Sequence, residues 1–303
     1  MVLVVISFYV SASISPYFLD VDYLLGSTTL YLEAGMLALA MTLVIVAGQI
    51  DLSVASTLAL VACLCAWLGE HTQIPWGLIL ALAPMAGLAL GAFNGWLVAY
   101  FGLPSLAVTL ATMALYRGAA QILVGDHSIR LPDWLVGIDY VNIPGTPVPL
   151  PLLLFLFVAL LFALLLHKTV FGRWIVSIGT NEEAARFSGV PVPRVKFLVF
   201  AISGMMASLA GLMMASRFEV ARFDHARGME LDVITAVVLG GTNIFGGRGT
   251  IFGSVVALFL IAILKTGMGV ANVKAENQLA IVGILLIAAV IANNLMVKWQ
   301  AHD

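Results

Sequence analysis

The chain has 303 residues, of which 62% are hydrophobic and only 10% are charged, and its formal net charge is -2. Soluble domains carry about 25% charged residues, so this composition excludes a soluble globular protein and indicates an integral membrane protein. The slightly acidic balance excludes the broad basic surface that binding to nucleic acid requires.

Ten apolar runs predict an all-α membrane protein, a single transmembrane domain over residues 1–303 that forms a bundle of about ten transmembrane or half-membrane helices. A helix needs about 20 residues to cross the hydrocarbon, and the runs 54–68 and 231–241 are too short to cross alone. The run 2–15 lacks the positive leader of a signal peptide, and we interpret it as a first span that is short or clipped at its start. The runs cover residues 2–15, 30–47, 54–68, 76–100, 105–124, 148–167, 195–216, 231–241, 250–268 and 278–297.

The basic residues predict a cytoplasmic N-terminus, because Lys and Arg collect in the cytoplasmic loops of membrane proteins. The inner side has only one basic residue more than the outer side, but most of the acidic residues fall on the outer side and increase the difference in charge. Arg117 falls within a span. The inner set is Lys168, Arg173, Arg186, Arg194, Lys196, Arg248 and Lys298, and the outer set is Arg130, Arg217, Arg222, Arg227, Lys265 and Lys274.

The sequence AGQIDLSVAS, residues 47–56, interrupts two apolar runs and places Asp51 between them. Asp51 can cap the following helix by accepting backbone N–H bonds, or it can carry a function within the membrane, and the two roles can coexist. Irregular backbone at membrane depth is tolerated only where it is buried in protein or lines a cavity. A transport route would therefore be sought at the two breaks, at Gly48, Asp51, Ser53, Gly240, Gly241, Thr242 and Asn243.

The second break is the glycine-rich stretch LGGTNIFGGRGTIFG, residues 239–253, which raises the question of a nucleotide site. A phosphate-binding loop of the ATPase kind needs Gly-x-x-x-x-Gly-Lys-Ser/Thr after a strand. This stretch has no lysine, and apolar helices flank it. Glycines also let a chain turn with positive φ and let helices approach closely, so we predict a tight turn that joins a half-length helix to a full one.

Other polar and small residues within the apolar runs predict contacts between helices. Gly87, Gly91 and Gly95 recur every four residues and predict a helix-packing face, with Asn94 beside it as an interhelical hydrogen bond. Glu33 is expected at the membrane interface. Arg117 is either paired within the protein or extends to the outer surface, and both interpretations stay open.

The inner connection GRWIVSIGTNEEAARFSGVPVPRVKF, residues 172–197, predicts a short separate helix. Thr180 or Asn181 can cap it, two glutamates occupy its first turn, and Gly189 followed by prolines ends it. A helix of two turns is not stable alone. It is held either by its own bundle or by a cytoplasmic partner, and the residues alone do not decide between the two.

Four ordered motifs carry a resemblance to a known family: TLVIVAGQIDLSVAS, NGWLVAYFGLPSLAVTLATMALYRG, FGRWIVSIGTNEEAARFSGV and LDVITAVVLGGTNIFGGRGTIFGS. They resemble the permease subunits of bacterial ABC importers for monosaccharides, of the ribose, xylose, arabinose, galactose, rhamnose and autoinducer-2 type, and more distantly the branched-chain amino-acid permeases. The resemblance covers residues 19–297, and the preceding stretch departs from it by lacking a basic lead-in. AGQIDLSVAS and LVGDHS favour the rhamnose or autoinducer-2 type, although the sugar itself cannot be deduced from the sequence.

The resemblance implies an inner-membrane assembly with several partners. It implies a second permease subunit (identical or paralogous), cytoplasmic ATP-binding subunits and a periplasmic sugar-binding protein. ATP hydrolysis would belong to the partner, so no catalytic residue, cofactor or metal is expected in this chain. The coupling segment would be residues 168–194, with Ala184, Ala185 and Phe187 as its contact surface. The coupling helix would comprise Asn181, Glu182, Glu183, Ala184, Ala185, Arg186, Phe187 and Gly189.

Competing functions stay open at this point. A permease of the same superfamily for amino acids or other small solutes is second to a sugar permease, and a passive channel or an intramembrane enzyme is third. An enzyme needs a His, Asp, Glu or Ser constellation within the spans, and no such cluster is visible in the sequence. The outer segment 217–230 has mixed charges, and is either a solvated loop or a docking site for the binding protein.

Overall fold

The computed structural model describes residues 20–137 and 141–274, together with 276–278, 280, 281, 283, 284, 287 and 291. In this part of the chain, seven helical segments are long and apolar enough to cross a membrane. The first segment combines α2 (Val21–Thr28), the 3-10 turn η2 (Thr29–Tyr31) and α3 (Leu32–Val46). The other six are α4 (Val54–His71), α5 (Trp76–Tyr100), α6 (Ser105–Val124), α7 (Leu150–Lys168), α10 (Val192–Phe218) and α12 (Ile251–Val270).

Shorter elements connect these spans. They are β1 (Ile129–Arg130), η3 (Asp133–Leu135), α8 (Val170–Thr180), α9 (Glu182–Phe187), β2 (Val220–Ala221) and α11 (Met229–Leu239). The strands β1 and β2 pair antiparallel, with Ile129 opposite Ala221 and Arg130 opposite Val220. This small ladder ties the connection after α6 to the segment after α10.

The predicted helical membrane fold is confirmed, apart from the short ladder of β1 and β2 and one error in helix length. The run 54–68 belongs to α4, which continues to His71 and is 18 residues long. At 1.5 Å per residue it spans about 27 Å, so the prediction that it cannot cross alone is wrong. α11 has 11 residues and is too short to cross, as predicted. The run 2–15 and most of 278–297 lie outside the described residues, so the count of about ten segments is not established.

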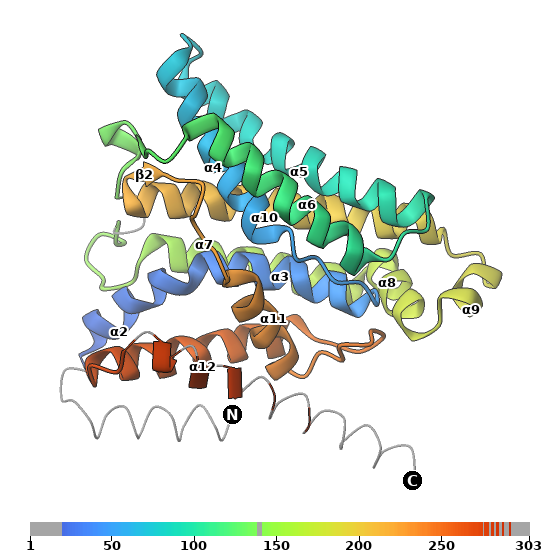
Figure 1. Cartoon of the computed structure of the whole chain (residues 1–303). Helices are drawn as coiled ribbons and strands as arrows, with labels where there is room; N and C mark the ends of the chain where they lie inside the picture. The colour runs from blue at the N-terminus through green and yellow to red at the C-terminus, as the bar shows by residue number, and fades with distance from the viewer. Residues whose placement is uncertain are drawn as a thin grey trace.

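α3 and α10 occupy the centre of the bundle. Nearly every residue of α3 is buried, and so is most of α10. α10 packs against α5, α4 and α3, and α3 in turn packs against α11, α12, α7 and α8 (Figure 1). α5 and α7 bury only a narrow face within the chain and leave the rest of their apolar surface exposed.

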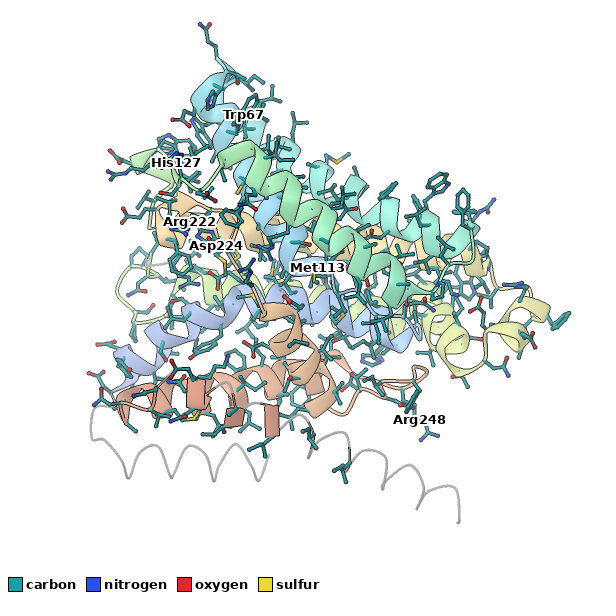
Figure 2. All side chains as sticks on the ribbon, in the orientation of Figure 1. Trp67, Met113, His127, Arg222, Asp224 and Arg248 are labelled. Carbon is teal, nitrogen blue, oxygen red and sulfur yellow. The ribbon has the colours of Figure 1, made fainter. Side chains whose placement is uncertain are left out.

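The connections collect at the two ends of the helices. α8 and α9 lie at one end, on the right of Figure 1, together with the loop between α11 and α12. Strand β2 and the start of α2 lie at the other end. Figure 2 places Arg248 at the first end, and His127, Arg222 and Asp224 at the second. This grouping separates the connections as the predicted orientation requires, and we call the two ends inner and outer after that prediction.

Candidate functional site

α5 meets α10 along its three regularly spaced glycines. A β-carbon built on Gly87 would overlap the carbonyl oxygen of Gly204, and one built on Gly91 would overlap that of Phe200. A β-carbon on Gly95 would lie 2.8 Å from the carbonyl oxygen of Phe197. Only residues without side chains allow two helices to approach this closely.

A buried polar network surrounds Asp51, in the break between α3 and α4. Ser53 donates its hydroxyl and its backbone N–H to Asp51 Oδ1 (2.6 and 3.0 Å), and Ser203 Oγ donates to Oδ2 (2.8 Å). Asn94 Nδ2 donates to Ser53 Oγ (2.8 Å), which confirms the predicted interhelical bond. The network joins the break to α5 and α10.

Asp51 accepts a backbone N–H bond at the start of α4, as a cap would, and it also binds across the bundle. The position before the first helical residue is Ser53, and its side chain makes no capping bond. Asp51 lies two residues earlier, where one carboxylate oxygen reaches the N–H of Ser53. Its other oxygen accepts the bond from Ser203 and so connects the break to α10.

Two further charged groups bind within the protein. Arg117 Nη1 donates to the carbonyl oxygens of Phe223 (2.5 Å) and His225 (2.7 Å) in the outer segment, so Arg117 is paired within the protein and also reaches toward the outer end. Glu33 was expected at the membrane interface, and this stays a prediction. Its side chain is fully buried in the central helix α3 and accepts a hydrogen bond from Arg217 Nε at 2.7 Å.

The two predicted breaks meet each other at the inner end. Gly247 N donates to the carbonyl oxygen of Val46 at 2.9 Å. A β-carbon on Gly179, in the last turn of α8, would overlap that same oxygen, and one on Gly246 would lie 2.8 Å from Gly48 Cα. Gly48 itself has φ +72°. We call this backbone contact of α3, α8 and the glycine loop the inner junction.

The glycine loop is the predicted tight turn between α11 and α12. Gly241, Gly246 and Gly247 have positive φ, and Asn243 N donates to the carbonyl oxygen of Arg248 at 2.9 Å. Gly240 packs against the backbone of α12, because a β-carbon added to Gly240 would lie 2.5 Å from the carbonyl carbon of Gly253.

The residues predicted for a transport route do not share one surface. Asp51, Ser53 and Thr242 are buried, and Thr242 Oγ1 has no hydrogen-bond partner among the described residues. Gly48 lines a cavity of about 440 Å³ at the inner end, whose charged lining residues are Glu182, Arg186 and Lys196. The assignment of these residues to a route therefore remains a prediction.

The short inner helix exists as α9. Asn181 Oδ1 accepts the backbone N–H of Ala184 at 2.9 Å and caps the helix. Gly189 has φ +81°, a conformation that favours glycine. The caps are local features, which explains why the sequence indicated them.

The bundle holds one face of α9 and leaves the other exposed. Ala185 is only 1% exposed, and Glu182 Oε2 accepts a hydrogen bond from Lys196 Nζ in α10 at 2.6 Å. The prediction that Ala185 offers a contact surface is therefore wrong, because it packs on its own chain. Glu183, Ala184 and Phe187 point outward, and Phe187 is 90% exposed.

With this geometry in place, comparison with known proteins identifies the family. Residues 23–290 match the model of the branched-chain amino acid transport system permease component. The chain belongs to this permease family. Each of the following relatives is an Autoinducer 2 import system permease protein LsrD. This chain is 35% identical over 286 residues to the protein from Photorhabdus laumondii subsp. laumondii. It is 36% identical over 290 residues to the protein from Klebsiella pneumoniae subsp. pneumoniae and 36% identical over 288 residues to the protein from Salmonella typhimurium.

Each of these alignments covers 93% of this chain and 86% of the relative. No solved structure matches the permease. The predicted resemblance to importer permeases is confirmed, and with it the prediction of a multi-pass protein of the inner membrane.

Proposed function

We propose that this permease is a membrane subunit of an ATP-driven importer that carries autoinducer 2 or a similar small sugar into the cell. The observation that carries the proposal is the similarity, over 93% of the chain, to permeases named for autoinducer 2 import. Branched-chain amino acids, which appear in the family's description, are the alternative cargo. The relatives do not favour them.

The permease would be non-catalytic and would act with partners. Cytoplasmic ATP-binding subunits would hydrolyse ATP, a periplasmic binding protein would deliver the cargo, and a second permease subunit would complete the pore. The apolar runs 2–15 and 278–297 would bring the bundle to about ten segments. The outward face of α9, with Phe187 at its end, supports its assignment as the contact with the ATP-binding subunit.

The inner junction supports a route for coupling. α9 follows directly on α8, and the last turn of α8 contacts both Val46 and Gly247 through backbone atoms. A displacement of α9 would therefore reach the breaks at Gly48 and in the glycine loop without passing through flexible side chains. Coupling of two distant sites needs such an element with two arrangements.

An uptake assay tests the proposed cargo. Cells that carry every other subunit of the importer but lack this permease should not remove autoinducer 2 from the medium, and restoring the permease should restore uptake. Leucine uptake, measured in parallel, should not change. Loss of leucine uptake with normal removal of autoinducer 2 would favour the amino-acid alternative and contradict the proposal.

We expect the glycine loop to open during transport. Thr242→Cys, in a background without Cys63 and Cys65, should react slowly with a polar thiol reagent at rest, because Thr242 is fully buried. Its reaction should accelerate about tenfold or more when ATP is trapped on the partner. A shift of about 1.4 kcal/mol toward the open form of the loop raises the open population about tenfold. Phe245→Cys, at an exposed position of the same loop, is the control and should react in both states. An inert Thr242→Cys beside a reactive control removes this loop from the route.

A further inference from the structure

A second cavity, of about 660 Å³, lies at the outer end between the end of α10 and the start of α11. Its volume falls within the range of sites for small molecules, which combine apolar walls with a few placed polar groups. Its apolar lining includes Phe218 and Met229. Its polar lining consists of Arg217, Arg222, Asp224, His225, Arg227 and Asp232.

Ion pairs neutralise most of the charge in this outer cavity. Within the described part of the chain, four of its five charged lining residues, all but Arg227, have an opposite charge within ion-pair distance. The cavity is therefore poorly suited to a strongly anionic or cationic ligand, because little net charge remains to attract one. The pairs are Glu33–Arg217 at 2.7 Å, Asp224–Arg222 at 2.8 Å and Asp232–Lys265 at 2.6 Å, and Figure 2 shows Arg222 and Asp224 together at the outer end.

The walls of the cavity are fixed by contacts from other helices. Arg117 in α6 binds the carbonyl oxygens of Phe223 and His225. Glu33 in α3 and Lys265 in α12 hold two of the lining side chains through the ion pairs described above. A site whose groups are already held in place loses less free energy of ordering when a ligand binds.

His225 and Phe218 supply the surfaces that a hydroxyl-bearing ring needs. Burial lowers the pKa of the His225 imidazole by more than the neighbouring Asp224 charge raises it, so the ring is neutral at physiological pH. A neutral imidazole can donate through one nitrogen and accept through the other, and a hydroxyl group can match either role. His225 Nδ1 is buried and has no hydrogen-bond partner among the described residues. The half-exposed Phe218 ring lies 5.2 Å from the His225 ring, centroid to centroid, and the Arg217 guanidinium lies over it at 4.4 Å, so the ring adds apolar surface mainly through its exposed edge.

We propose that the outer cavity is a binding site for a neutral, hydroxyl-bearing cargo molecule of sugar size, which the permease receives there before passing it inward. This inference rests on the proposed import function and adds the place at which the cargo is first held. The competing use of the same segment is docking of the binding protein, for which the exposed Arg222 and Arg227 would be available.

The test uses the complete importer in proteoliposomes, with its ATP-binding subunits, purified binding protein and autoinducer 2 as the probe. Met229→Trp would fill the cavity, and Leu231→Trp is the matched control on an exposed position of the same helix. We expect Met229→Trp to lower the autoinducer 2 imported per ATP hydrolysed by about tenfold. Leu231→Trp should have no effect. The maximal ATPase rate and the binding-protein concentration at half-maximal stimulation should stay unchanged in both.

His225→Ala is the second variant, because it keeps the cavity open and removes only the polar ring. Like Met229→Trp, it should lower the autoinducer 2 imported per ATP hydrolysed. If Met229→Trp fails to assemble, the result for His225→Ala is used to test the proposal. Normal import per ATP in the assembled variants would overturn the proposal. A raised half-saturating concentration of binding protein with normal import per ATP would overturn it in favour of docking. If the wild-type importer carries no autoinducer 2, the proposed function fails first, before any variant is compared.

Discussion

Replacing Gly91 with leucine is expected to abolish folded permease in the membrane. A β-carbon at this position would overlap the carbonyl oxygen of Phe200 and lie 3.0 Å from Gly204 Cα, so the obstacle is backbone and not a movable side chain. Extra carbon atoms in a packed core already cost about 1–3 kcal/mol when side chains can adjust. Here α5 and α10 would have to separate, which would also strain the nearby Asn94–Ser53 hydrogen bond.

The measurement is the amount of monodisperse permease recovered from membranes in mild detergent. Gly118→Leu is the matched control, since a β-carbon on Gly118 in α6 would meet no atom within 4 Å. It should accumulate normally, and Gly91→Ala should fall between the two. Wild-type recovery of Gly91→Leu would show that the face of α5 carrying Gly91 does not need this close approach.

The glycine pattern shows what a local sequence can and cannot specify. A spacing of four residues identifies one face of one helix, and Gly87, Gly91 and Gly95 do share the face that meets α10. The partner of that face was not predicted, because Gly204 lies in a stretch of small residues, ISGMMASLAG, with no feature that links it to α5. The same holds for Gly179, whose contact with Val46 creates the inner junction.

The partners of the charged residues were not predicted, because they are distant in sequence. Glu33 pairs with Arg217, 184 residues away, and nothing near Glu33 announces that partner. For Asp51 two roles were left open, and its bond to Ser203, 152 residues away, was not predicted. The sequence indicates that a charge at membrane depth is costly unless it is paired. It does not indicate which residue pairs with it.

α9 was predicted well in its limits and poorly in its orientation. Its cap and its end depend on Asn181 and Gly189, which lie next to the helix. Its orientation depends on Lys196 in α10, which binds Glu182 and turns Ala185 inward. A helix of six residues is too short for its pattern of polar and apolar residues to predict which face is buried.

Phe187→Asp is expected to separate the permease from its ATP-binding subunit without unfolding it. Phe187 is 90% exposed at the end of α9, so it contributes little to the stability of the bundle. Burial of a phenylalanine side chain in a partner contributes about 1.5–3 kcal/mol, and an aspartate there would also leave a charge without water. We expect co-purification of the ATP-binding subunit to fall by at least about tenfold, with an unchanged melting temperature of the permease.

Two other variants distinguish contact with a partner from packing within the chain. Phe245→Asp is the matched control, an exposed phenylalanine of the glycine loop at the same end of the molecule, and it should retain the ATP-binding subunit. Ala185→Leu should show the opposite pattern, because its added bulk would press against the permease's own core and lower the melting temperature. A stable Ala185→Leu together with an unstable Phe187→Asp that keeps its partner would reverse the assignment of the two faces. Coupling through α9 would then have to be abandoned, while the fold and the family would stand.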